Sequence, residues 1–69
     1  MKEQVINQVK EIRLELGLTQ EEMAKKAGVS RQSIISIEQG RYIPSLPLAL
    51  KFAKIFQRPT DSIFQLKEE

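Results

Sequence analysis

Four neighbouring residues carry the side chains best suited to recognising another molecule: Arg31, Gln32, Ile35 and Ser36. Arginine can pair with the acceptor atoms of guanine, glutamine can bind adenine through two hydrogen bonds, and an aliphatic side chain can contact the methyl group of thymine. On a helix that turns by about 100° per residue, Gln32 and Ser36 lie opposite the apolar Ile34. An ordinary solvated helix carries the same residue types, so this face alone leaves both interpretations open.

Catalytic and metal-dependent functions are poorly supported by the composition. The 69-residue chain has neither histidine nor cysteine, which removes the commonest general base, a common nucleophile and the usual zinc ligands. The sequence contains no phosphate-binding loop and no metal-ligand spacing. We therefore expect a protein that is not an enzyme and that holds no metal or other cofactor.

The composition also indicates a cellular compartment. The lack of cysteine excludes a disulfide framework and fits a reducing environment. The first residues contain no apolar leader segment, and no apolar run reaches the length of about 18 residues that a membrane-spanning helix needs. We expect a soluble, cytoplasmic protein without membrane contact.

Two short helices joined by a tight turn are predicted in the middle of the chain. Thr19 and Glu22 have the spacing of a capping box, which starts a helix after Thr19. Gly28 can adopt the left-handed conformation that ends a helix, and Ser30 can cap the next one. So short a connection makes the helices cross steeply, which is the layout of a helix-turn-helix. The second helix then offers its polar face to solvent, an arrangement that favours DNA contact.

Charge is unevenly distributed along the chain. Residues 25–58 contain seven basic residues and one acidic residue, Glu38, whereas the other acids lie toward the two ends. A positive middle suits a polyanion bound on one side of the molecule. The net charge of +2 is modest, and basic residues scattered over a solvated surface remain the alternative.

A first helix is predicted before the helix-turn-helix. Its apolar stripe consists of Val5, Val9, Ile12 and Leu16. The helix ends at Gly17, and Leu18 packs just beyond it. If Asn7 caps the helix, residues 5 and 6 lie outside it and could form a short strand.

Two further helices and a strand are predicted after the helix-turn-helix. Residues 46–56 form a helix that is too apolar for a surface position and must be covered on two sides. Residues 60–62 can cap a short helix that carries Ile63 and Phe64. Residues 65–67 alternate in polarity and could pair as a strand with the segment before the first helix.

Together these motifs resemble the Cro and repressor type of helix-turn-helix protein, often called the Xre family. The matching residues are Arg13, Leu16 to Gln20, Glu22, Ala24, Gly28 to Ser30, Ile34, Ile37, Glu38, Gly40, Pro44 and Ser45. The resemblance covers about residues 5–66 and implies a single domain over residues 1–69. It implies an all-α, five-helix, lambda-repressor-like fold, to which the termini could add a short two-stranded antiparallel sheet.

The resemblance implies that the second motif helix reads bases while flanking residues hold the DNA backbone. Base contacts would come from Arg31, Gln32 and Ser36, and the residue type of Ile35 would add a contact with a thymine methyl. The residues near the backbone would be Gln20, Ser30, Ser33, Gln39, Arg41 and Tyr42. Tyr42 could equally cover the edge of the core. Since Ile35 and Ser36 offer few hydrogen bonds, DNA shape could also contribute to sequence discrimination.

The resemblance also implies two contacts inside the domain. Gln20 would steady Gln32, and Arg13 would form a partly buried ion pair with Glu38. This pair explains an acid on the inner face of a basic helix, because an unpaired buried charge would be costly.

The residues themselves suggest a surface where two subunits could meet, formed by Phe56, Pro59 and Ile63.

The expected function is that of a homodimeric transcriptional regulator, a repressor that reads double-stranded DNA. Its operator would be near-palindromic, with half-sites about one helical turn, or roughly 34 Å, apart. No small-molecule effector is evident from the sequence. Two alternatives stay open, an antitoxin and a protein-interaction module of the same fold, each acting mainly through a partner protein.

Overall fold

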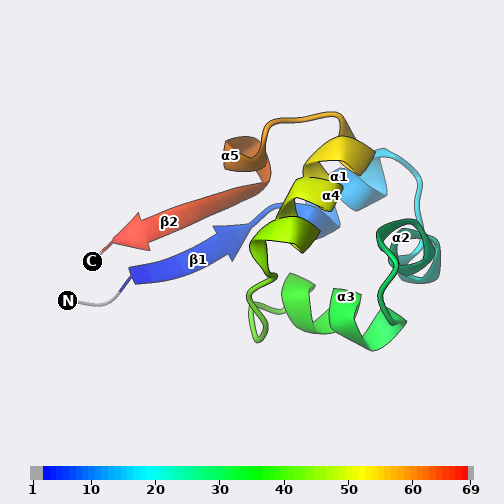
Figure 1. The fold of residues 1–69 in the computed structure, drawn as a ribbon, viewed down its shortest axis with the longest axis horizontal. Coiled ribbons are helices and arrows are strands. Elements are labelled where there is room, and N and C mark those ends of the chain that lie inside the picture. The colour runs from blue at the N-terminus through cyan, green and yellow to red at the C-terminus, as the bar shows by residue number, and fades with distance from the viewer. Residues whose placement is uncertain (1–2, 69) are drawn as a thin grey trace.

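The computed structural model describes residues 3–68, which contain five helices and two strands (Figure 1). The elements in chain order are β1 (Glu3–Asn7), α1 (Val9–Glu15), α2 (Gln20–Ala27), α3 (Arg31–Glu38), α4 (Leu46–Phe56), α5 (Thr60–Ile63) and β2 (Phe64–Glu68). The helices gather into one body, and the two strands extend from it as a ribbon (Figure 1). The predicted five-helix fold and its terminal sheet are confirmed.

The two strands are antiparallel and join the ends of the chain. Val5 pairs with Leu66, Ile6 with Gln65, and Asn7 with Phe64, as the alternating pattern predicted. Paired residues point to the same side of a sheet, so Asn7 and Phe64 share the face that turns toward the helices. The Phe64 ring stacks on Phe52 of α4, with ring centroids 6.0 Å apart. The base of the sheet is therefore fixed to the core.

Local hydrogen bonds set the start and end of α2 as predicted. The Thr19 hydroxyl accepts from the Glu22 amide at 3.0 Å, and the Glu22 carboxylate accepts from the Thr19 amide at 2.8 Å. Gly28 ends the helix with a φ of 73°, a conformation that strains residues with a Cβ. Ser30 then caps α3, its hydroxyl accepting from the Ser33 amide at 3.1 Å.

The capping box predicts a pH-dependent part of the stability. The hydrogen bond from the Thr19 amide, then that from its hydroxyl and the charges of Lys26 and Lys25, lower the pKa of Glu22 below 4.5. A lowered pKa means that this contribution is complete above pH 4.5 and is lost as the pH falls through the folded-state pKa. Glu22→Gln should lower Tm by a few degrees near neutral pH.

Thermal denaturation at several pH values tests this prediction. The difference in Tm between wild type and Glu22→Gln should shrink as the pH drops below the pKa of a free glutamate carboxyl. Glu21→Gln, which removes a neighbouring charge outside the capping box, is the matched control. An equal difference at neutral and at strongly acidic pH would contradict the assignment.

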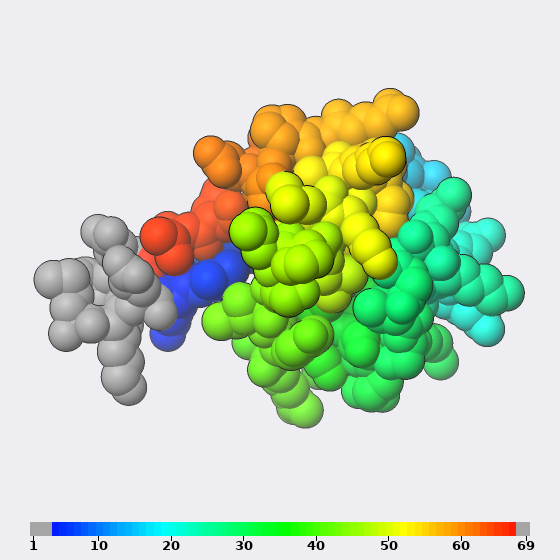
Figure 2. Space-filling view, viewed as in Figure 1, coloured from blue at the N-terminus to red at the C-terminus, as the bar shows by residue number. Residues whose placement is uncertain are grey.

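The core lies between α4 and the other helices. Its largest fully buried side chains are Phe52, Met23, Ile34, Ile37, Ile63 and Val9. Helix α4 packs against both α2 and α5, and the space-filling view shows it running between the helix-turn-helix and the C-terminal segment (Figure 2). The prediction that this apolar helix is covered on two sides is confirmed.

Three local predictions need correction. Leu16 is 47 % exposed rather than part of the buried stripe, because it follows the end of α1 at Glu15 and the chain then reverses at Gly17, which has a φ of 71°. Pro59, not a polar side chain of residues 60–62, precedes α5, which lacks a side-chain cap. Phe64 belongs to β2 instead of α5, since it pairs with β1.

None of the helices within residues 3–68 has the length and apolarity needed to cross a membrane.

Candidate nucleic-acid interface

Helix α3 presents one face to the core and the other to solvent. Ile34 and Ile37 are fully buried, whereas Arg31 and Gln32 are exposed and Ser36 is partly exposed. Ile35 is also partly exposed, on the flank of the polar face. The structure therefore keeps the four predicted base-reading side chains at least partly open to solvent on one helix.

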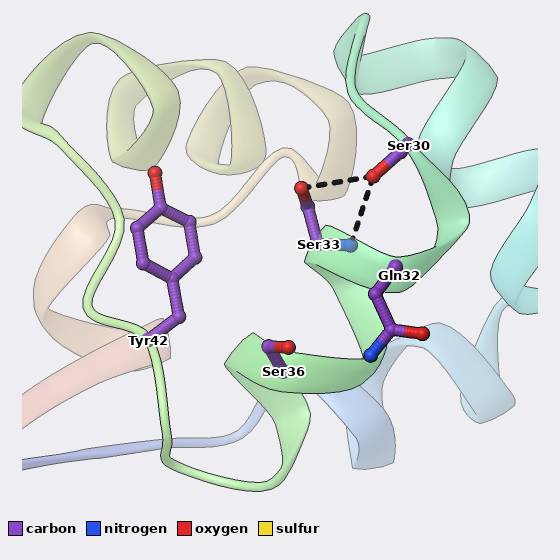
Figure 3. Close-up of a pocket in the computed structure, with 5 residues that line it drawn as sticks. All are labelled: Ser30, Gln32, Ser33, Ser36 and Tyr42. Carbon is purple, nitrogen blue, oxygen red and sulfur yellow. Dashed lines mark hydrogen bonds between the residues drawn. The ribbon is translucent and has the colours of Figure 1, made fainter.

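An open groove of about 340 Å³ runs along the outer face of α3. It is lined by Ser30, Gln32, Ser33, Ser36 and Tyr42. The Tyr42 ring, on the loop after α3, stands opposite the serines of the helix (Figure 3). Tyr42 is 44 % exposed, so it forms a wall of the groove instead of only covering the core. The groove offers hydroxyl and amide groups, which can donate hydrogen bonds to phosphate or base acceptors.

The Ser30 and Ser33 hydroxyls are held next to each other at the start of the groove. Their oxygens lie 3.0 Å apart, and Ser30 also accepts from the Ser33 amide (Figure 3). One hydroxyl hydrogen of such a pair can bridge the two oxygens, which leaves the other free to donate outward. This end of the groove can therefore donate one hydroxyl hydrogen bond outward.

A second hollow, of about 540 Å³, lies between the start of α2 and the start of α3. Arg31 and Gln20 both line it, so the hollow brings a predicted base-reading residue beside a predicted phosphate contact. The Gln20 side-chain amide donates to Glu38 at 3.1 Å, rather than to Gln32 as predicted. The physical reason is that an ionised carboxylate is a stronger acceptor than a neutral amide oxygen.

The predicted ion pair between Arg13 and Glu38 is confirmed. Arg13 Nε lies 2.7 Å from Glu38 Oε2, and the two side chains are only 8 % and 4 % exposed. Arg13 Nη2 also donates to Glu38 Oε1, at 3.3 Å, and Nη1 donates to the Leu18 carbonyl oxygen at 2.8 Å. With the bond from Gln20, these contacts tie α1, α2 and α3 together at one buried charge.

A tight turn ends α3 and places the basic residue that follows. The amide of Gly40 donates to the Ile37 carbonyl at 3.0 Å, and the amide of Arg41 donates to the Ser36 carbonyl at 2.9 Å. These two bonds form a Schellman motif, which needs the φ of 78° at Gly40. Arg41 and Gln39 are consequently exposed at the end of α3, beside the groove wall formed by Tyr42.

Comparison with known proteins places the chain in a family. A helix-turn-helix family model matches residues 9–63, which is most of the chain. This protein belongs to that helix-turn-helix family.

Its helix-turn-helix relatives include bacterial and archaeal proteins. The Bacillus subtilis HTH-type transcriptional regulator YgzD is 46 % identical over 63 residues, which cover 91 % of this chain and 96 % of YgzD. An HTH-type transcriptional regulator of Methanocaldococcus jannaschii is 51 % identical over 63 residues, with the same coverage. The crystal structure of a candidate DNA-binding protein from Bacteroides fragilis has the same fold, with a TM-score of 0.80 at 21 % identity over 88 % of this chain and 98 % of that one.

Two residues of this helix-turn-helix domain lie against the elements of the candidate site without having been predicted to do so. The Lys51 ammonium of α4 lies beside the turn between α2 and α3, 3.7 Å from where a Cβ on Gly28 would stand. Asn7 donates a hydrogen bond to the Ile37 carbonyl at the end of α3. The basic middle of the sequence indicated Lys51 only as one charge among several, and Asn7 was expected only to cap α1.

The predicted subunit contact needs correction. Phe56 is 4 % exposed and Ile63 is fully buried, because both complete the core of their own chain. Pro59 alone of the three is exposed. The exposed aliphatic side chains of this region are instead Ile43, Leu46, Leu50 and Leu66. Leu46 and Leu50 lie one turn apart on α4, on the side that its neighbours leave open.

Proposed function

We propose that this protein is a homodimeric, sequence-specific DNA-binding regulator that represses transcription. We also propose that it is a cytoplasmic protein. The observation that carries the proposal is α3, whose inner face is buried and fixed by the Arg13–Glu38 pair while its outer face offers exposed hydrogen-bonding side chains. The names of the relatives, HTH-type transcriptional regulators, support it. A repressor of this kind acts by occupying DNA that the transcription machinery needs.

In this proposal α3 lies in the major groove, which is wide enough to admit a helix. Arg31 and Gln32, at its N-terminal end, would contact base edges first, as recognition helices do. Ser36 lies one turn further along the same face, and Ile35 can contact a thymine methyl. Recognition would therefore depend chiefly on Arg31 and Gln32.

The residues around α3 would hold the DNA backbone on either side of the groove. Gln20, Ser30 and Ser33 lie before or within the first turn of the recognition helix, whereas Gln39, Arg41 and Tyr42 lie at or after its end. Contacts at both ends of a helix fix its register on the duplex without reading sequence. The end of the groove next to Ser30 and Ser33 is the part that we assign to a phosphate.

Gln32→Ala and Arg41→Ala should affect DNA binding in different ways. Gln32→Ala should cost about 1–3 kcal/mol on the preferred sequence and relax the preference at one base position. Arg41→Ala should weaken binding to all sequences alike and lower the slope of log affinity against log salt by about one. Fluorescence anisotropy with preferred and scrambled duplexes over a salt series measures both effects.

The two variants serve as controls for each other, since both change exposed side chains and should leave Tm near that of wild type. If both lost the same amount of sequence preference, the division between base and phosphate contacts would be wrong. If neither altered DNA affinity, α3 would not be the DNA-reading element.

The homodimer would form through exposed aliphatic side chains, namely Leu46 and Leu50, one turn apart on α4, together with Ile43 and Leu66. These side chains are between 52 % and 69 % exposed, and exposed apolar patches of this kind commonly mark contacts between proteins. A second copy would cover the patch with the same residues, as a two-fold interface requires. Two recognition helices could then enter successive major grooves about 34 Å apart.

A further inference from the structure

The side chain of Asn7 connects three elements of the fold. Asn7 is the last residue of β1 and pairs with Phe64, the first residue of β2. Its Oδ1 accepts a hydrogen bond from the Val9 amide, at 3.1 Å, at the start of α1. Its Nδ2 donates to the Ile37 carbonyl oxygen of α3, at 2.9 Å. Both polar atoms of this partly buried side chain are thus used, by two different helices.

The acceptor of the Asn7 amide lies in the last turn of the helix that we assign to base reading. Carbonyl groups in the last turn of a helix have no amide partner four residues ahead, so other donors must satisfy them. Ile37 also accepts from the Gly40 amide of the turn that ends α3. Asn7 therefore holds the end of α3 at the point from which the chain continues to Arg41 and Tyr42.

The same residue stands where the terminal sheet leaves the core. Directly after Asn7, the Gln8 amide donates to the Ile63 carbonyl at 2.8 Å, and Phe64 stacks on Phe52. Backbone pairing fixes β2 relative to Asn7, and one side-chain hydrogen bond fixes Asn7 relative to α3. Leu66, on β2, is one of the exposed aliphatic side chains that we assign to the subunit contact.

We propose that Asn7 is a positioning residue that sets the orientation of α3 relative to the terminal sheet, and with it the half-site spacing that the dimer prefers. This inference rests on the proposed function. Because the two subunits would meet partly through β2, a fixed link from the sheet to α3 fixes the separation of the two recognition helices. The Asn7 side chain itself touches no base.

Asn7→Asp removes the link while keeping the hydrogen bond to the Val9 amide at the start of α1. One carboxylate oxygen can still accept from the Val9 amide. The other oxygen replaces the amide nitrogen Nδ2 that donated to Ile37, and it repels the Ile37 carbonyl oxygen. Gln4→Glu is the matched control, because it makes the same amide-to-acid change on the exposed face of the same strand. Asn7→Ser is a second, uncharged variant that retains an acceptor for Val9 but is too short to reach Ile37.

The first readout is amide hydrogen exchange by NMR, which is independent of DNA. Exchange at Gly40 and Arg41 should become about tenfold faster in Asn7→Asp and Asn7→Ser than in wild type, because the end of α3 opens more easily. Gln4→Glu should exchange like wild type. Unchanged exchange at these amides in a folded Asn7 variant would overturn the link between the sheet and α3.

The second readout is affinity for operators whose half-sites are moved apart or together by one base pair. Wild type and Gln4→Glu should prefer one spacing by about tenfold or more, and the Asn7 variants should lose most of that preference. A purely structural role would lower Tm and leave the spacing preference intact, which would overturn the positioning role. If wild type itself showed no sequence preference on any duplex, the proposed function would fail, whereas faster exchange would still establish the link itself.

Discussion

Arg13→Leu is expected to lower the free energy of unfolding by about 3–5 kcal/mol, because it leaves a buried carboxylate without its partner. Glu38 is 4 % exposed in the pair, so water cannot replace the two bonds from the guanidinium. The Leu18 carbonyl loses its donor as well. A loss of this size is a large part of the total stability of a small domain and should lower Tm by at least about 12 °C.

Chemical and thermal denaturation of three variants test this prediction. Arg58→Leu breaks an exposed ion pair of similar length, 2.8 Å to Glu15, and should cost less than about 1 kcal/mol. The double variant Arg13→Leu/Glu38→Leu should regain much of the lost stability, since it leaves no buried charge. An Arg13→Leu protein with the Tm of wild type would show that the pair does not stabilise the fold.

Leu50→Asp is expected to reduce affinity for a two-half-site operator by about two orders of magnitude or more, without lowering the Tm of the subunit. Leu50 is 52 % exposed, so a charge there can stay hydrated in a single chain. In a dimer the same charge would face its symmetric copy across an apolar contact. Separate subunits lose the high effective concentration that binds the second half-site, which typically contributes 10²- to 10⁴-fold.

Analytical ultracentrifugation and operator binding measure this effect together. Leu14→Asp is the matched control, because Leu14 is a similarly exposed leucine, 58 %, on a different helix. It should leave both the sedimentation coefficient and the operator affinity unchanged. A Leu50→Asp protein that sediments and binds like wild type would place the subunit contact elsewhere.

Features set by neighbouring residues could be predicted from the sequence. The capping box of Thr19 and Glu22 and the cap at Ser30 depend on contacts within three residues, and each occurs as expected. The pairing of the terminal strands followed from the alternation at residues 65–67 and from a helix start at Asn7, which left residues 5 and 6 free to pair with them. The ion pair of Arg13 with Glu38 followed from the cost of an unpaired acid on an apolar helix face and from the family resemblance.

Features set by packing between distant segments could not be predicted in the same way. Phe56 and Ile63 look like candidates for a subunit contact on a helical wheel, but α4 and α5 turn them into their own core. Gln20 donates to Glu38, 18 positions away in the sequence, and only the packing of α2 against α3 brings this acceptor to it. Asn7 reaches Ile37 across 30 positions of sequence, a contact that no local pattern indicates.

Sequence-specific DNA binding is tested most directly by selection from a random duplex library, with the purified protein at near-physiological salt. We expect enrichment of an inverted repeat whose half-site centres lie about one helical turn apart, and an altered base preference at one position of each half-site with Gln32→Ala. Weak, salt-sensitive binding without any enriched sequence would contradict DNA reading by α3. It would direct attention instead to a partner protein.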